Sequence, residues 1–445
     1  MRRLAFLCCL LPALAPAQEE PPVAEPAVEE PALESDAEQA DDTYELMKVF
    51  TDTFEQIDRN YVKEVDRRRL IEGAVRGMLA ELDPYSNYIA PDELTGFTED
   101  IEQSFGGIGV QVEYDPQLKA LEIVAPLPGS PAFEVGLLSG DKIVKVDGEL
   151  LSSFPANRVN SEAVKRLKGT PGEQVEVGVV RAGADGIQDY LVTRKVIELP
   201  TVFGATRGGD GEWQYVLPEE PNVGYIRVSH FTRRTAAELR EAVKAAQASG
   251  AECLILDLRF NPGGLLTAAV EICDLFLEEG KIVSTEGRNS RPRVWRARRF
   301  GTIEDLPVAV LINRYSASAS EIVSAALQDA GRATVIGERS WGKGSVQNVI
   351  DVEEGQSALK LTTASYFRPS GKNIHRFAGA TEDDEWGVTP NDGYLQRLTN
   401  EQMARLQREQ RDVYMRKPVE DPFEDPHIRK AVEVLNNAAQ KADAA

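Results

Sequence analysis

The sequence predicts a multidomain α/β protein with helical segments at both ends, and three observations support this fold class. The chain has 445 residues, enough for roughly three domains. Residues 198–395 alternate strand-like apolar runs with helix-like runs, which is typical of an α/β sheet. Residues 99–197 hold several short strand-like runs, and the two ends of the chain are mostly helical in pattern.

Composition and charge exclude several classes of function. Lys and Arg total 50 and Asp and Glu total 72, so the formal net charge is −22. A protein this acidic lacks the basic footprint of a general binder of nucleic acids or anionic membranes. Four cysteines and three histidines provide few ligands for a structural zinc site, and no two histidines have a metal-ligand spacing. We therefore predict no metal and no cofactor.

The N-terminus has the pattern of a secretory signal peptide. Residues 1–17 contain two arginines, an apolar run and a final Ala-Pro-Ala, which predicts cleavage after Ala17. The apolar run is too short for a comfortable membrane span, and no other stretch approaches the length of a transmembrane helix. Residues 18–42 contain ten acidic residues and no basic residue, which predicts a disordered acidic linker. We expect an exported protein, periplasmic or secreted, with no integral membrane span after cleavage.

Residues 43–98 form a predicted helical N-terminal segment. Apolar residues recur there at three- and four-residue spacing, at Leu46, Val49, Phe50, Phe54 and Ile57. A second helix is predicted for residues 68–82, and Asp83-Pro84 ends it. Residues 396–445 form a helical C-terminal segment. Both segments allow either self-association into a homo-oligomer or packing on the core.

The β-rich module at residues 99–197 resembles a PDZ domain of the protease-associated kind. The resemblance is carried by Gly129-Ser130-Pro131-Ala132, Gly136-Leu137, Gly140-Asp141-Lys142-Ile143 and Val146-Asp147-Gly148. It implies a groove that binds the C-terminus of a peptide as an added strand. It also implies a loop that holds the peptide carboxylate, made by Gly107, Ile108, Gly109 and Val110. Taken alone, these glycines would be better explained by a tight β turn, but the rest of the pattern favours the carboxylate loop.

Residues 198–395 are the predicted α/β core. Strand-like runs lie at residues 223–228, 253–258, 309–312 and 334–336, and helix-like runs at residues 236–249, 266–277 and 321–329. Cys253 lies in a strand-like run and Cys273 in a helix-like run. We interpret both as small buried residues, although export would permit a disulfide.

Two polar segments of this core carry candidate chemistry. Residues 315–321 link a strand to a helix whose N-terminus supplies N–H donors for an oxyanion. Ser318 and Glu321 also fit an S-x-x-E capping box, so Ser318 alone would be interpreted as a helix cap. Residues 337–345 match the G-x-x-x-x-G-K pattern of a phosphate-binding loop. That match is weak, because Gly344 stands where Ser or Thr should bind Mg²⁺ and a strand-like run follows.

Together the two segments suggest a Ser-Lys pair. A serine hydroxyl needs a base, and burial can move the pKa of a lysine from about 10.4 towards neutrality. Glycines on both sides of Lys343 let the backbone pass close to another strand. Gln347 lies on the same face of the predicted strand, where its amide would orient the amine without adding a negative charge.

Three motifs look like the signature of the carboxyl-terminal processing peptidases, also called tail-specific proteases. They are Asp257-Leu258-Arg259-Phe260-Asn261-Pro262-Gly263-Gly264, Ser316-Ala317-Ser318-Ala319-Ser320-Glu321 and Gly342-Lys343-Gly344-Ser345-Val346-Gln347. This resemblance implies a Ser-Lys endopeptidase with a crotonase-like, ClpP-like α/β protease core into which the PDZ domain is inserted. On the matching positions it implies these roles: Ser318 as nucleophile, Lys343 as general base, Gln347 orienting Lys343, and the amides of Gly264 and Ala319 as the oxyanion hole.

We therefore expect a serine endopeptidase that cleaves exported proteins at or near exposed C-terminal tails through an acyl-enzyme. The alternative is a catalytically silent PDZ scaffold that only binds peptides. In this family the PDZ domain often also gates the active site. An activating adaptor is a further expected partner. Where the family usually has a short G-x-x-P-D ending, this chain has an insertion-like segment at residues 382–386.

Overall fold

The computed structural model of the protein describes residues 34–155, 157–209, 211–303 and 306–443. The predicted signal peptide, residues 1–17, and residues 18–33 of the predicted linker lie outside the described residues. The chain divides into two compact units, one up to Ile71 and one from Glu72 onward.

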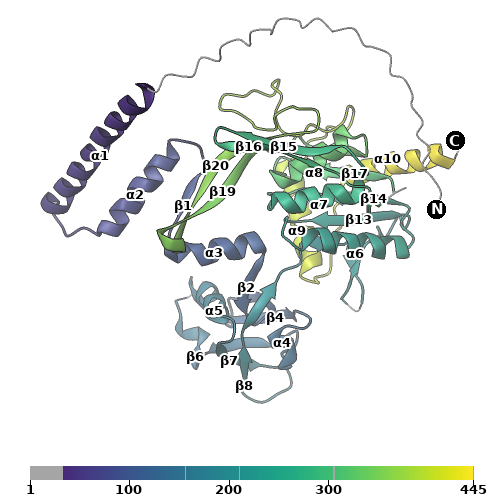
Figure 1. Ribbon diagram of the computed structural model, residues 1–445. Helices are drawn as coiled ribbons and strands as arrows, with labels where there is room; N and C mark the ends of the chain where they lie inside the picture. The colour runs from purple at the N-terminus through teal and green to yellow at the C-terminus, as the bar shows by residue number, and fades with distance from the viewer. Residues whose placement is uncertain (1–33, 156, 210, 304–305, 444–445) are drawn as a thin grey trace, which may run out of the picture. The chain divides into compact units, whose positions relative to one another are not determined.

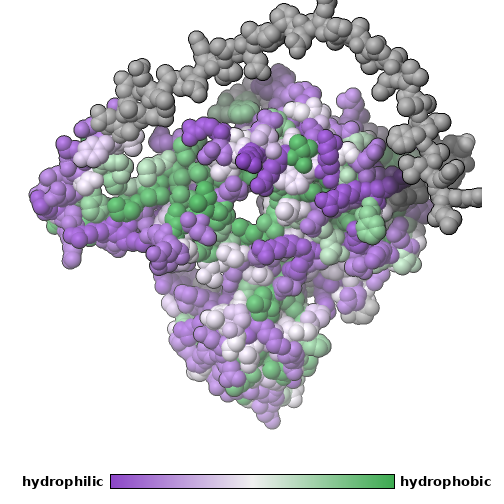
Figure 2. Space-filling view, viewed as in Figure 1, coloured by the Kyte–Doolittle hydropathy of each residue, from purple (hydrophilic) through white to green (hydrophobic). Residues whose placement is uncertain are grey.

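The N-terminal unit contains helix α1 (Glu34–Asn60) and the start of helix α2 (Arg67–Ala80). α1 begins inside the predicted linker, because residues 34–42 are rich in Ala, Glu and Gln, which favour helix despite the acidic charge. An ion pair of 2.7 Å between Arg67 and Asp58 joins the two helices. Apolar side chains of α1, such as Leu46 and Val49, are exposed, and Figure 2 shows apolar surface on this helix. Self-association stays a prediction.

The PDZ-like module spans two small sheets. Strand β2 (Ser104–Gly107) pairs antiparallel with β9 (Lys195–Glu198). The larger sheet has the order β3-β4-β5-β7-β8, with β6 paired to β5. Its strands and helices are β3 (Val110–Asp115), β4 (Ala120–Pro126), α4 (Pro131–Glu134), β5 (Lys142–Val146), β6 (Glu149–Leu150), α5 (Val159–Leu167), β7 (Gln174–Val180) and β8 (Gln188–Thr193). Strand β3 lies at the edge of this sheet, so one side of its backbone is not paired within the sheet.

The α/β core is built on a sheet of order β10-β13-β14-β17-β18. Its strands are β10 (Val202–Phe203), β13 (Val223–Val228), β14 (Cys253–Asp257), β17 (Val308–Ile312) and β18 (Ala333–Gly337). The last four are parallel, and β14 and β17 are buried along their whole length. Burial on both faces explains why these strands are uninterrupted apolar runs in the sequence. A small hairpin, β11 (Thr206–Arg207) and β12 (Trp213–Gln214), precedes β13.

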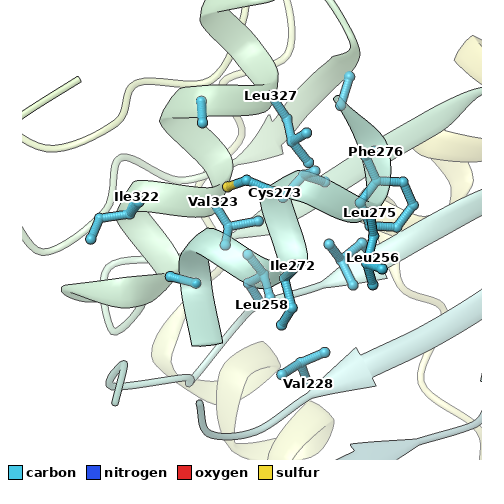
Figure 3. Packing of buried hydrophobic residues seen from close by; sticks show 14 of the residues in the cluster. Val228, Leu256, Leu258, Ile272, Cys273, Leu275, Phe276, Ile322, Val323 and Leu327 are labelled. Atoms are coloured by element: carbon cyan, nitrogen blue, oxygen red, sulfur yellow. The ribbon is translucent and has the colours of Figure 1, made fainter. Parts of the chain in front are cut away.

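Helices cover both faces of this sheet. Helices α6 (Thr235–Ala248), α7 (Leu266–Phe276) and α8 (Ala319–Asp329) pack on one face, and α10 (Pro426–Asp443) packs on the other (Figure 1). Alternate residues of β14 serve the two sides, because successive strand side chains point in opposite directions. Leu256 packs with Ile272 and Val323 in the first cluster (Figure 3), whereas Ile255 packs with Leu435 in the second.

The two cysteines of the described chain are buried and free of disulfides. Cys273 packs inside the cluster between α7 and α8 (Figure 3), and Cys253 packs on the opposite side of the sheet. Burial raises the pKa of the Cys253 thiol to about 11 and raises that of Cys273 as well. Both therefore have the structural role that the sequence predicts for small buried residues.

A second sheet, of order β1-β20-β15-β16 with β19 paired to β20, carries the segment after Lys343. Its strands are β1 (Asn87–Ile89), β15 (Lys281–Gly287), β16 (Ser290–Arg296), β19 (Ser345–Val352) and β20 (Ser357–Phe367), and helix α3 (Pro91–Glu102) follows β1. Strands β1, β15 and β16 are absent from the sequence-based assignment. β1 is only three residues long, and the exposed arginines of β16 hide any apolar alternation.

The C-terminal segment contains helix α9 (Asn400–Tyr414) and then α10. Among the described residues, no helix combines the length and the apolar character that crossing a bilayer requires. The segment at residues 382–386 packs over Arg339, whose Nη1 and Nε donate to the carbonyls of Glu382 (2.8 Å) and Trp386 (3.0 Å). Trp386 is buried beside Gly342, so this insertion-like segment forms one wall of the loop that carries Lys343.

Candidate active site

Ser318 occupies a strained turn between strand β17 and helix α8. Its φ of 56° and ψ of −113° are rare for a residue with a Cβ, and such a conformation costs about 1–3 kcal/mol. Hydrogen bonds to the neighbouring loop hold the turn, because Asn261 O accepts from Ala317 N (3.0 Å) and from Ser320 Oγ (2.9 Å). The surrounding fold therefore imposes this conformation and places a serine at the helix N-terminus.

The Ser318 hydroxyl does not cap the helix. Glu321 forms its half of the predicted capping box, since its Oε2 accepts from Ser318 N at 2.8 Å. The Ser318 Oγ lies instead 2.9 Å from the hydroxyl of Tyr366, on strand β20. The Ser318 side chain is buried, with 6% of the residue exposed, and is available for a role other than capping.

Glu321 joins the turn of Ser318 to the loop of Lys343. Its Oε2 also accepts from Lys343 N at 2.8 Å, and its Oε1 accepts from Gly342 N and Ser340 Oγ, both at 2.6 Å. Burial raises the pKa of this fully enclosed carboxyl, while the four donors act in the opposite direction. One carboxylate thus fixes the distance between two segments that are far apart in the sequence.

The Lys343 side chain is half-buried and carries a perturbed amine. Burial, together with the smaller effect of the nearby charge of Lys360, lowers the pKa of Lys343 to about 8. Among the described residues its Nζ makes no hydrogen bond, and the ring centroid of Tyr85 lies 5.2 Å away. The structure brings Ser318 and Lys343 to one site through Glu321, but shows no hydrogen bond between the Ser318 hydroxyl and the amine. An amine with a pKa near neutrality can accept a proton at physiological pH.

Gln347 lies on strand β19, opposite Thr362 of β20. Its Nε2 donates to Ser345 Oγ at 2.8 Å and contacts Thr362 Oγ1 at 3.3 Å. Within the described chain the amide makes no hydrogen bond to Lys343. The structure therefore places Gln347 next to the loop of Lys343 with its amide directed at two hydroxyl groups.

The predicted oxyanion donors lie next to Ser318. A Cβ added to Gly263 would come within 2.7 Å of Ser318 Cβ and 3.0 Å of Ala319 N, so this loop touches the serine turn. Gly264 has a φ of 147°, and a Cβ there would meet the carbonyl oxygen of Phe231 at 2.2 Å. Among the described residues, neither Gly264 N nor Ala319 N has an acceptor. Two unused amides beside a serine fit the geometry of an oxyanion hole.

The predicted carboxylate loop lies between strands β2 and β3. Gly109 has a φ of 76°, and a Cβ there would come within 2.4 Å of Ser130 Cβ, so only glycine fits. The carbonyl of Gly109 accepts from Leu127 N and Ser130 Oγ, both at 2.9 Å. Within the described chain the amides of Ile108 and Gly109 have no acceptor. Gly107 is the last residue of β2, and Val110 is the first residue of β3.

Other chemistries have little support at this site. Among the described residues, no group of three or more His, Cys, Asp or Glu side chains could hold a metal ion. Residues 345–352 form strand β19, whereas a phosphate-binding loop of this pattern leads into a helix. His427 is buried beside Arg259, and His375 packs against Tyr85, so neither lies at the Ser318 hydroxyl.

Comparison with known proteins shows the family of this chain. The profile described as peptidase family S41 matches residues 222–391, that of a PDZ domain matches residues 122–181, and that of the activating protease CtpB N-terminal domain matches residues 18–93. A carboxy-terminal-processing protease of Bartonella bacilliformis is 38% identical over 354 residues, which cover 78% of this chain and 75% of that protein. The chain belongs to the carboxy-terminal processing peptidases of family S41.

Two further proteins are similar to this chain. The carboxy-terminal processing protease CtpA of Bacillus subtilis is 36% identical over 73% of this chain and 65% of its own length. A solved structure titled photosystem II D1 C-terminal processing protease has 28% identity and a TM-score of 0.42, covering 78% of this chain and 92% of that one. The predictions of the family and of an α/β peptidase with a PDZ domain are confirmed, and the protein is a serine-type peptidase.

Three residues of the candidate site escaped the analysis of the sequence. The sequence marks Glu321 only as a capping residue, because three of its four donors come from residues 340–343, which are distant in the sequence. Tyr366 and Tyr85 lie on or next to strands of the second sheet, and only a three-dimensional structure brings them to Ser318 and Lys343. The tyrosines stand outside the motifs, so no local signal marked them.

Replacing Tyr366 by Phe is expected to lower the kcat/KM of this peptidase by no more than about tenfold. The change removes one buried hydrogen bond to the Ser318 hydroxyl, and such a bond contributes about 1 kcal/mol. Burial raises the pKa of Tyr366 to about 12, so the phenol stays protonated at neutral pH and is a poor base. Steady-state kinetics on one peptide substrate measure the effect. A loss as large as that of Lys343→Ala would make Tyr366 part of the proton transfer.

Proposed function

We propose that the protein is an exported endopeptidase that cleaves proteins at or near unstructured C-terminal tails with a Ser318–Lys343 dyad. The neutral amine of Lys343 takes the proton of the Ser318 hydroxyl as Oγ attacks a backbone carbonyl carbon, and later gives it to the leaving amine. Water then attacks the acyl-enzyme, with the same lysine as base. Export follows from the predicted signal peptide at residues 1–17.

The observation that carries this proposal is the bond pattern of Glu321. Its Oε2 accepts from the backbone amides of both Ser318 and Lys343, each at 2.8 Å. The nucleophile and the base are thereby anchored to one buried atom. For attack, the Ser318 hydroxyl has to exchange its bond to Tyr366 for one to the amine of Lys343.

The oxyanion of the tetrahedral intermediate is assigned to the amides of Gly264 and Ala319. Ala319 is the first residue of helix α8, so its amide points out of the helix N-terminus, where the helix dipole favours negative charge. The loop of Gly264 is held on its other side by Phe231, whose N donates to Gly263 O at 3.1 Å and whose O accepts from Leu265 N at 2.7 Å. Preorganised donors of this kind typically contribute about 3–4 kcal/mol each to catalysis.

The PDZ domain is proposed to bind the tail of the substrate. The free amides of Ile108 and Gly109 offer donors for a terminal carboxylate, and the unpaired edge of β3 offers backbone groups for an added strand. Gln347 is assigned to orienting Lys343 during turnover. An activating adaptor remains a proposed partner, supported by the match of residues 18–93 to an activating-protease N-terminal domain.

Ser318→Ala and Lys343→Ala are each expected to abolish turnover of a folded protein that carries an unstructured apolar tail. Each removes a group that forms or breaks a bond, so the loss should exceed about a thousandfold. The measurement is cleavage followed by mass spectrometry of the intact products, with binding of a fluorescent tail peptide recorded in parallel. Both variants should still bind the peptide.

The same experiment separates the proposal from its rival. A silent PDZ scaffold would bind the tail peptide and leave it uncleaved in the wild type too. Wild-type cleavage that persists in either variant would exclude the dyad. Weaker binding of the same tail peptide with an amidated C-terminus would support the assignment of the carboxylate loop.

A further inference from the structure

A turn in the segment before strand β1 places an aromatic ring beside the amine of Lys343. Asp83 closes this turn, because its Oδ1 accepts from Tyr85 N (2.7 Å) and Ser86 N (2.8 Å) and its Oδ2 from Ser86 Oγ (2.8 Å). Ser86 Oγ in turn accepts from Thr362 N on strand β20 at 3.0 Å. The turn is therefore fastened to the sheet that follows Lys343.

The ring of Tyr85 is held from the other side as well. Trp341 Nε1 donates to the Tyr85 hydroxyl at 3.4 Å, and the His375 ring packs edge-on with centroids 6.3 Å apart. The His375 segment lies close to the loop of Lys343, since a Cβ added to Gly344 would meet His375 N at 2.3 Å. Aromatic groups from two other segments thus hold the Tyr85 ring, whose centroid lies 5.2 Å from the Lys343 amine.

We propose that Tyr85 is a positioning residue for proton transfer: its ring covers the side chain of Lys343, excludes water from the amine and so increases the uncharged fraction of the amine. The proposal rests on the proposed function, in which Lys343 is the general base. Tyr85 lies outside the motif of Lys343, in a different part of the chain. The proposed role gives the segment before β1 a direct part in the chemistry.

The causes of the lowered pKa of Lys343 are consistent with a ring that excludes water from the amine. Burial is the main cause that lowers the pKa of Lys343 to about 8. The charged groups that act on the amine are Lys360 on β20, which lowers its pKa, and Glu321 on α8 and Asp83 in the turn, which raise it. His375, beyond the Tyr85 ring, has a pKa lowered by burial.

A cation–π interaction between Lys343 and the Tyr85 ring would change the pKa of the amine in the opposite direction. The face of an aromatic ring attracts an ammonium ion within about 6 Å, which favours the charged lysine. If exclusion of water dominates, removing the ring raises the pKa of the amine. If attraction to the ring dominates, removing the ring lowers it. The direction of the change therefore decides the proposal.

The test is the pH profile of kcat/KM for the full chain and its Tyr85→Ala and Tyr85→Phe variants. The wild-type profile should rise through a midpoint near pH 8, the pKa of the amine. Tyr85→Ala should move the midpoint upward by about one unit or more, because a solvated lysine titrates near 10.4. At pH 7 the loss should be at least about tenfold and should recover above pH 10. Tyr85→Phe keeps the ring and should restore the wild-type midpoint.

A second readout needs no proteolytic activity. In the Ser318→Ala background, the rate at which an amine-reactive acylating reagent modifies Lys343 is followed against pH by peptide mass spectrometry. The midpoint should again rise in Tyr85→Ala. An unchanged or lower midpoint, or a loss of activity equal at every pH, would overturn the role of Tyr85. Full activity of Lys343→Ala would instead refute the general base, and the labelling result would still report on Tyr85.

Discussion

Replacing Glu321 by Gln is expected to lower kcat/KM by about 100-fold and to reduce the free energy of unfolding by about 3 kcal/mol. The carboxylate accepts four hydrogen bonds, two on each oxygen, from a site that excludes water. An amide has one oxygen and one NH₂ group. In either orientation its NH₂ faces at least one backbone N–H that can only donate.

The structure favours one of the two orientations of this glutamine. Turned towards Ser340, the NH₂ would meet a hydroxyl that can accept, and would leave only Gly342 N unpaired. Turned towards the other pair, it would face the amides of Ser318 and Lys343. Either way the loop of Lys343 shifts relative to Ser318, and a misplacement of about 1 Å can cost about 100-fold in rate.

A neighbouring buried glutamate provides the matched control for this prediction. Glu338 is 2% exposed and binds Arg314 (2.6 and 3.0 Å) and Leu398 N (2.7 Å), but touches neither Ser318 nor Lys343. Glu338→Gln should also lower the melting temperature, while kcat/KM stays within about threefold of wild type. Equal kinetic losses in the two variants would show that Glu321 acts only through stability.

The parallel core could be predicted from the sequence because burial on both faces leaves an unmistakable apolar run. Residues 223–228, predicted as a strand, are β13 with the same bounds. Strands whose pattern is set by partners elsewhere were not predictable. β16 is an edge strand whose arginines and proline obscure its single core-facing contact at Trp295.

The candidate site shows the same division between local and distant information. Ser318 and Lys343 lie in motifs that a reader of the sequence can recognise, since each motif is a few consecutive residues. Glu321 sits in the first motif, but its role depends on amides 21 and 22 residues further along the chain. Tyr85 lies more than 200 residues before Lys343, so its contact exists only through the pairing of β1 with β20.

Replacing Arg259 by Met is expected to destabilise the protein by about 3–5 kcal/mol at neutral pH, as seen when one partner of a buried ion pair is removed. The Arg259 side chain is fully buried and binds Asp257 at 2.6 Å and Asp425 at 2.7 Å. Asp257 also accepts from the hydroxyl of Tyr225 at 2.7 Å. Asp425 immediately precedes helix α10, so the guanidinium links the catalytic side of β14 to the C-terminal helix.

The loss of stability in Arg259→Met should be largest at neutral pH and smaller at acidic pH, because Arg259 holds Asp257 ionised. Burial alone would raise the pKa of Asp257, but the charge and hydrogen bonds of Arg259 hold it below its ordinary value. In the wild type this carboxylate therefore stabilises the fold above its unfolded pKa of about 3.9. Without Arg259, burial would make the Asp257 carboxyl bind a proton more readily than in the unfolded chain. The deficit of the variant should then shrink as the pH falls from 7 towards 4.

Thermal unfolding of Arg259→Met and of the double variant Arg259→Met/Asp425→Asn measures the effect. Asp425→Asn removes one of the two carboxylates that lose their partner when Arg259 is replaced. The double variant should therefore recover part of the lost stability at pH 7 and little at pH 4. Arg314→Met is the control, because Arg314 is 41% exposed and its partner Glu338 keeps a backbone donor. A smaller loss for Arg259→Met than for Arg314→Met would mean that water reaches Asp257 and Asp425 when α10 is docked. In that case the network would specify where α10 docks without contributing to stability.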